Sequence, residues 1–178
     1  SLAQGIDTVA GNRGAHAEGQ NTRADGTESH AEGYQTMAIG NFSHAEGDQA
    51  TSTGEYSHAE GKGTFAIGRY SHAGGHGTVI GHDAGTAIGT YNDTSQNILF
   101  VVGDGTASNA RSDAMTINTA GDSFFYHDIS VNRDATIGND ITVGNNATVG
   151  NNATVQNDAI VNNTATVKNW AKSYDTQL

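Results

Sequence analysis

The stretch that decides the fold is a five-residue motif repeated at a fixed spacing. It is AHAEG at 15–19, SHAEG at 29–33, 43–47 and 57–61, and SHAGG at 71–75. SLAQG (1–5) precedes these copies in the same register, and every step is 14 residues. The chain therefore contains a tandem array of equal units. Such arrays fold as stacked coils, because each unit is stabilised mainly by its neighbours.

The composition agrees with a stack of thin coils. Only 35% of the 178 residues are hydrophobic, and three are Leu, which is too little for the thick core of an ordinary globular domain. The net charge of −11 argues against nucleic acid and anionic lipid as partners. No run of 18 apolar residues is present, so we expect no membrane insertion.

Glycine divides each unit into two halves of seven residues. It recurs at every seventh position from Gly19 to Gly75, which excludes a coiled coil and predicts two short strands per unit, each ending in a glycine turn. Strand alternation places Ser, Ala and Gly of the motif on the inner face, with His and Glu outward. The predicted inner structural residues are Ala17, Gly19, Ala31, Gly33, Ala45, Gly47, Ala59, Gly61, Ala73 and Gly75.

Apolar pairs in the second halves point outward in this scheme. They are Met37 with Ile39 and Phe65 with Ile67, and we expect them to be buried against another chain. We assign Ile39 and Ile67 to the core of a trimer. After Gly75 the segment 74–89 departs from the motif, and we expect it to close the stack.

The repeats resemble a known family. MAIG (37–40), FAIG (65–68) and TAIG (86–89) are similar to motifs in the head of trimeric autotransporter adhesins. This resemblance implies a left-handed parallel β-roll packed as a trimer. The SHAEG form is still more similar to repeats of phage and prophage tail-fibre and tail-spike proteins.

A different pattern follows the array. Apolar or alternating segments at 97–103, 113–117 and 123–127 predict three strands of a β connector, in which Arg111 pairs with Asp104 or Asp113. Hexads then run from ISVNRD to ATVKNW, which suits either a left-handed β-helix within one chain or a stalk in which three chains each supply one face. We favour the three-chain stalk, because seven hexads would make a very short single-chain helix. The predicted axial residues of that stalk are Val131, Ile137, Val143, Val149, Val155, Val161 and Val167.

The predicted architecture is thus an all-β fibrous homotrimer. It consists of a β-roll head (1–90), a β connector (91–128), a hexad β-helical stalk (129–170) and a C-terminal tail (171–178).

The repeated histidines are the candidate site. They are His16, His30, His44, His58 and His72. One interpretation is a structural stack of rings whose charge neighbouring glutamates offset. The other is metal binding, because His and Glu ligate transition metals, and three copies of one His could converge at a trimer axis. Catalysis is not expected, since evenly repeated residues are not a single asymmetric constellation. No cofactor is expected either.

These observations predict a non-catalytic component of a phage or prophage tail fibre, located in the virion tail. Its partners would be two further copies of itself, other tail proteins and a glycan or protein receptor on the host surface. The alternative is the head of a trimeric adhesin on a bacterial cell surface. Receptor contacts are expected in the irregular loops 76–96 and 104–112.

Overall fold

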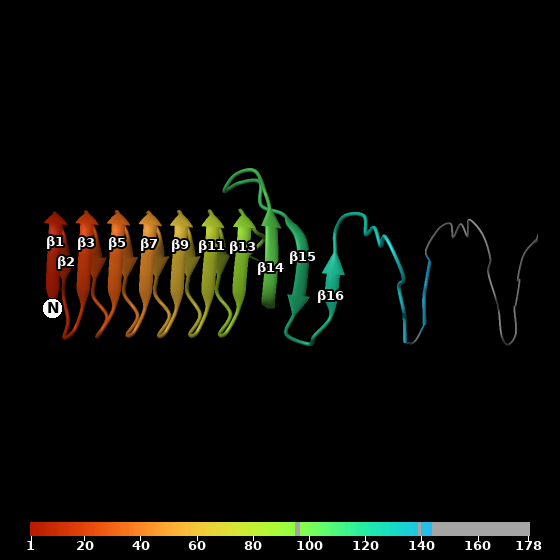
Figure 1. Ribbon diagram of the computed structural model, residues 1–178, viewed down its shortest axis with the longest axis horizontal. Helices are drawn as coiled ribbons and strands as arrows, with labels where there is room; N and C mark the ends of the chain where they lie inside the picture. The colour runs from red at the N-terminus through yellow and green to blue at the C-terminus, as the bar shows by residue number, and fades with distance from the viewer. Residues whose placement is uncertain (95–96, 139, 144–178) are drawn as a thin grey trace, which may run out of the picture. The chain divides into compact units, whose positions relative to one another are not determined.

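The computed structural model describes residues 1–94, 97–138 and 140–143. The chain divides into two compact units, one up to Ser130 and one from Val131 onward. In the first unit, a five-residue strand and a two-residue strand alternate along the chain (Figure 1). The long strands are β1 (Leu2–Ile6), β3 (His16–Gln20), β5 (His30–Tyr34), β7 (His44–Asp48), β9 (His58–Lys62), β11 (His72–His76) and β13 (Thr86–Thr90). The short strands are β2 (Val9–Ala10), β4 (Arg23–Ala24), β6 (Met37–Ala38), β8 (Thr51–Ser52), β10 (Phe65–Ala66) and β12 (Val79–Ile80).

The strands form two sheets, in which the strands of the coils pair in parallel. The long strands lie in a ten-stranded sheet that ends with β14 (Ile98–Asp104), β15 (Asp113–Asn118) and β16 (Ser123–Phe125), while the short strands form a six-stranded sheet. Register is uniform, so that Ala17 pairs with Ala31 and Ala31 with Ala45. The prediction of an all-β parallel β-roll is confirmed. The described residues include no helix, and hence none that could span a membrane.

Small side chains fill the interior of the coils. The alanine between His and Glu is fully buried in every repeat, as is a second alanine column from the short strands that includes Ala24, Ala38 and Ala66. Buried serines satisfy their hydroxyls locally; for example, Ser43 donates to the carbonyl of Gly40 at 2.6 Å. The two sheets can therefore lie close together without a layer of large apolar residues between them.

The strand-end glycines do not share this interior, contrary to the prediction. Gly19, Gly33, Gly47, Gly61 and Gly75 are exposed, with φ between 103° and 111°. A Cβ on Gly47 would lie 2.2 Å from the carbonyl oxygen of Gly61 in the next coil. Glycine is required here by backbone conformation and by the close neighbouring strand. Simple alternation fails because it assumes an extended backbone through the glycine.

The stack also continues further than expected. Segment 74–89 does not close it, because β13 pairs with β11 in register, Ala73 opposite Ala87. β14 keeps the same 14-residue step, with Val101 opposite Ala87. Among the described residues, the buried apolar side chains larger than alanine are at this end of the stack, where Ile80, Ile98 and Val101 are buried. The sequence did not reveal these coils because their side chains differ from the motif, although the 14-residue register is unchanged.

The three predicted connector strands are present as β14, β15 and β16, and their pairing is antiparallel. Asn92 covers the end of the short-strand sheet. Its side chain accepts a hydrogen bond from the Val79 amide at 2.8 Å and donates one to the Val79 carbonyl at 2.9 Å. An amide side chain thus replaces the next short strand.

In the second unit, the described residues 131–138 and 140–143 contain no strand. Val143, one of the predicted stalk residues, is exposed. Val149, Val155, Val161 and Val167, and with them most of the predicted stalk, lie outside the described residues.

Candidate functional site

The candidate site is a column of histidines and glutamates on the outer face of the long-strand sheet. Each of the SHAEG-type strands begins with His, and Glu follows two residues later in all but the last. The Ala after each His is buried, so the His and Glu side chains point outward. Parallel pairing in register aligns equivalent residues of successive coils. We call this set the His–Glu ladder. It consists of His16, His30, His44, His58, His72, Glu18, Glu32, Glu46 and Glu60.

The structure brings all five predicted histidines together as one stack. Ring centroids of His16, His30, His44 and His58 are 4.7–4.8 Å apart, with interplanar angles of 6° or less. His72 ends the stack at 5.2 Å and is tilted by 33°. The spacing is that of neighbouring strands, so the backbone sets it.

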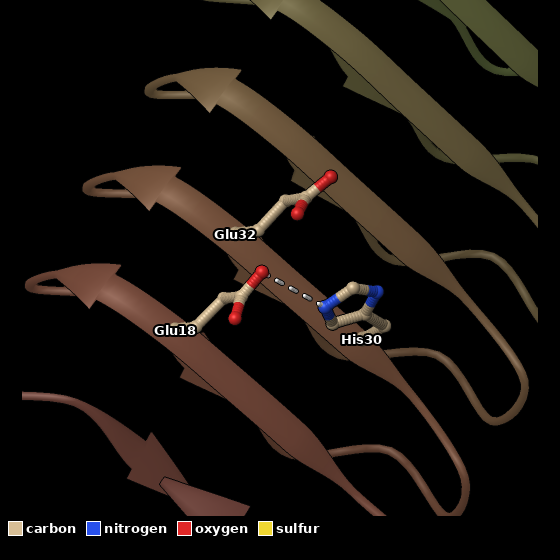
Figure 2. Close-up of side chains that lie close together, drawn as sticks. All are labelled: Glu18, His30 and Glu32. Atoms are coloured by element: carbon tan, nitrogen blue, oxygen red, sulfur yellow. Dashed lines mark ion pairs between the residues drawn. The ribbon is translucent and has the colours of Figure 1, made fainter. Parts of the chain in front are cut away.

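His30 faces Glu18 of the preceding coil (Figure 2), and the later histidines of the ladder face the preceding glutamate in the same way. Nε2 of His30 lies 4.0 Å from Glu18, and the separation is 3.6 Å for His44 with Glu32. It is 3.5 Å for His58 with Glu46 and 3.3 Å for His72 with Glu60. His16 has Gln4 in the preceding coil and lies 3.8 Å from Glu18 instead.

These ring nitrogens are buried without hydrogen-bond partners. Nε2 is inaccessible and unbonded in His16, His30, His44 and His58, although about a third of each side chain is exposed (34–36%). All of the distances to the carboxylates exceed the 2.7–3.2 Å typical of N–H···O bonds. A buried nitrogen without a hydrogen-bond partner destabilises the folded state, because it has lost its hydrogen bond to water and gained no other.

Within the carboxyl column, Glu32 holds a proton more readily than an isolated glutamate does. Hydrogen bonding to Glu46, burial and hydrogen bonding to Glu18 raise the pKa of Glu32 to about 7. The pKa of Glu46 is lowered, chiefly because it accepts the hydrogen bond from Glu32. The opposite directions describe one proton shared by the pair. Burial, followed by neighbouring histidines, lowers the pKa of His30 and His44.

Three groups of ladder residues each bring two carboxylates and one imidazole together. They are Glu18–His30–Glu32, Glu32–His44–Glu46 and Glu46–His58–Glu60, and the potential ligand atoms of each group lie within 4.8 Å of one another. The glutamates and the strand-end glycines also line a shallow open groove. The sequence predicted the histidines as candidate ligands, but not that glutamates of two neighbouring coils accompany each of them. The 12-residue spacing from Glu18 to His30 was the available signal.

The prediction of an irregular receptor-binding loop over 76–96 is wrong for most of that segment, because it contains β12 and β13 of the coils. The two predicted segments do lie side by side. Arg111 donates to the carbonyls of Gly77 and Asn92, at 2.8 and 3.1 Å. Its predicted pairing with Asp104 or Asp113 is wrong. Asp104 instead accepts hydrogen bonds from Ser112 and His127, and Asp113 accepts one from the Asp93 amide.

The outer face of the short-strand sheet carries the predicted apolar pairs. Met37, Ile39, Phe65 and Ile67 are 37%, 43%, 40% and 50% exposed. The two sheets therefore present chemically different outer faces, one ionisable and one partly apolar.

Comparison with known families gives one match. The model of the YadA head domain repeat, in two copies, matches residues 17–43, 31–57 and 45–71. No curated protein and no solved structure matches the chain. Residues 17–71 thus carry YadA-type head repeats on a parallel β-roll, as in an extracellular surface adhesin. This supports the adhesin alternative, whereas the phage tail-fibre prediction gains no support.

Proposed function

We propose that this chain, whose residues 17–71 match YadA head repeats, forms the head of a trimeric adhesin on a bacterial cell surface. The observation that carries the proposal is the match of consecutive 14-residue coils to that head repeat. The in-register parallel β-roll agrees with it. The function is binding to a glycan or protein on another surface, without catalysis.

The short-strand face is the proposed trimer contact. Ile39 and Ile67 occupy equivalent positions two coils apart, and Met37 and Phe65 accompany them. Burying these side chains against two further chains removes apolar area from water, at about 25 cal/mol per Å². The ionisable long-strand face then stays accessible. The adjoining segments 91–94 and 105–112, which lie outside the strands, are the proposed receptor-binding surface, because irregular segments can vary without disturbing the coils.

The decisive experiment measures assembly and adhesion on the same variants. Light scattering should give three times the 18.4 kDa chain mass. Replacing Ile39 and Ile67 together by Asp should yield monomers. Ile88→Asp is the matched control, because Ile88 is comparably exposed but lies on the long-strand sheet. Beads coated with the trimer should bind an array of host glycans and matrix proteins.

A monomeric wild-type chain would contradict the trimer, and beads that bind nothing on the array would contradict the adhesin. Phage tail genes beside the coding sequence would favour the tail-fibre alternative.

A further inference from the structure

The three Glu–His–Glu groups of the ladder have the composition of a cation site. We propose that the His–Glu ladder binds divalent transition-metal ions such as Zn²⁺, each held within one chain by one histidine Nε2 and two glutamate carboxylates. This inference goes beyond adhesion and does not depend on it. Each such site supplies three protein ligands and leaves a fourth position for water.

The distances within the ladder suit an ion better than a hydrogen bond. Two ligand atoms bound at about 2.1 Å to a tetrahedral ion lie about 3.4 Å apart. The Nε2-to-carboxylate separations are 3.6 Å at His44 and 3.5 Å at His58, and 4.0 Å at His30. The second carboxylate of each group lies within 4.8 Å. Glutamate side chains on this half-exposed face can rotate and bring the ligand atoms to the separation of about 3.4 Å that one ion requires.

Unpaired polar groups give an independent reason. Nε2 of His30, His44 and His58 is buried and has no hydrogen-bond partner, and it faces the carboxylates. In the neutral tautomer with the proton on Nδ1, this nitrogen presents its lone pair as a metal ligand does. A bound ion would satisfy an atom that the protein leaves unsatisfied.

Charge gives a third reason. Four carboxylates are stacked along neighbouring strands in a chain of net charge −11. Within the described residues, no Lys or Arg forms an ion pair with any of them. Bound divalent ions would offset the negative charge of this column.

Shared ligands set the expected stoichiometry. The first group (with His30) and the third (with His58) have no ligand in common, whereas the second (with His44) shares Glu32 with the first and Glu46 with the third. Two ions can therefore bind independently. The ladder ends where a carboxylate is missing, at Gln4 before His16 and at Gly74 beyond His72.

The test is a calorimetric titration of the chelator-treated full chain with Zn²⁺. We expect two ions per chain. His30→Gln should leave the second and third groups, which compete for Glu46, and should lose one ion. His58→Gln should lose one ion for the equivalent reason. His44→Gln should still bind two, because the first and third groups remain. Circular dichroism of each variant checks that the coils stay folded.

A rescue variant separates ligation from structure. Gly74→Glu added to His58→Gln supplies a new carboxylate beside His72 and Glu60, which completes a fourth group of the same composition and should restore the second ion. Gly74 has an ordinary backbone conformation, and a Cβ there would meet the movable Glu60 carboxylate at 3.1 Å. With Co²⁺ in place of Zn²⁺, the visible absorption of the bound ion should fall and return with the same variants.

The inference is overturned if wild type binds Zn²⁺ no more tightly than a variant in which His30, His44 and His58 are all Gln. It is equally overturned if His82→Gln, a histidine outside the ladder, loses ions as His30→Gln does. A trimer that binds no Zn²⁺ would refute the metal sites alone, and a monomer that binds two would refute only the trimer.

Discussion

Replacing a strand-end glycine should reveal how tightly the coils are stacked. In Gly47→Ala, the backbone must keep φ near 110°, which costs a non-glycine residue about 1–3 kcal/mol. The new Cβ would also lie 2.2 Å from the Gly61 carbonyl oxygen, so two paired strands must move apart, at about 1–3 kcal/mol more. We expect the free energy of unfolding to fall by about 4 kcal/mol in total.

Two other glycines provide matched controls. Gly63 has φ of 60° and no atom within 4 Å of the position that an alanine methyl would occupy, so Gly63→Ala should cost about 1–2 kcal/mol from backbone strain alone. Gly81 has neither a positive φ nor a close neighbour, and Gly81→Ala should change stability by less than about 0.5 kcal/mol.

Urea unfolding followed by circular dichroism, at one protein concentration, measures all three variants. If Gly47→Ala costs no more than Gly63→Ala, the close approach of neighbouring coils does not limit this position, and the reasoning is refuted.

Three further predictions concern polar groups. Asn92→Ala should lower the free energy of unfolding by about 2–3 kcal/mol, because the Val79 N–H and carbonyl both lose their hydrogen-bond partner. A decrease of less than about 1 kcal/mol in a urea titration would contradict this prediction. Arg111→Ala should accelerate amide hydrogen exchange around Gly77 and Asn92 and in segment 105–112, because the side chain that joins them is lost. Strands β3–β9 should exchange as in wild type, and equal acceleration there would refute the prediction. In chelator, the wild-type melting temperature should change little between pH 7 and 5.5. Histidines with lowered pKa lose stability below pH 6.5, whereas Glu32, with its pKa raised to about 7, gains stability as pH falls. The His30→Gln/His44→Gln variant should therefore melt higher at pH 5.5 than at pH 7, and a lower value would contradict the assignment.

Period and alternation were sufficient to predict the coils. Ala31 and its equivalents recur every 14 residues between two polar residues, and this places them inside a narrow roll. The same reasoning misplaced Gly47, because the left-handed turn of its backbone is not encoded in alternation. The same reasoning also predicted that the stack closes within 74–89, because Val101 occupies an alanine position in a segment that does not resemble the motif.

The candidate site was only half predictable. The column of histidines follows directly from the period, whereas the approach of His30 to Glu18 depends on which way side chains lean between neighbouring strands. Arg111 shows the same limit, because its partners are main-chain carbonyls, which no charge pattern marks.

Uniform register has an evolutionary consequence. Because every residue of one coil meets its counterpart in the next, loss or duplication of a 14-residue segment rejoins equivalent surfaces and leaves the local contacts unchanged. A gain or loss of any other length would shift buried alanines into solvent. Tandem coding repeats recombine readily in whole units, so related genes should differ in length by multiples of 42 nucleotides. Each added unit would extend the roll by about 4.8 Å and bring another imidazole and carboxylate with it.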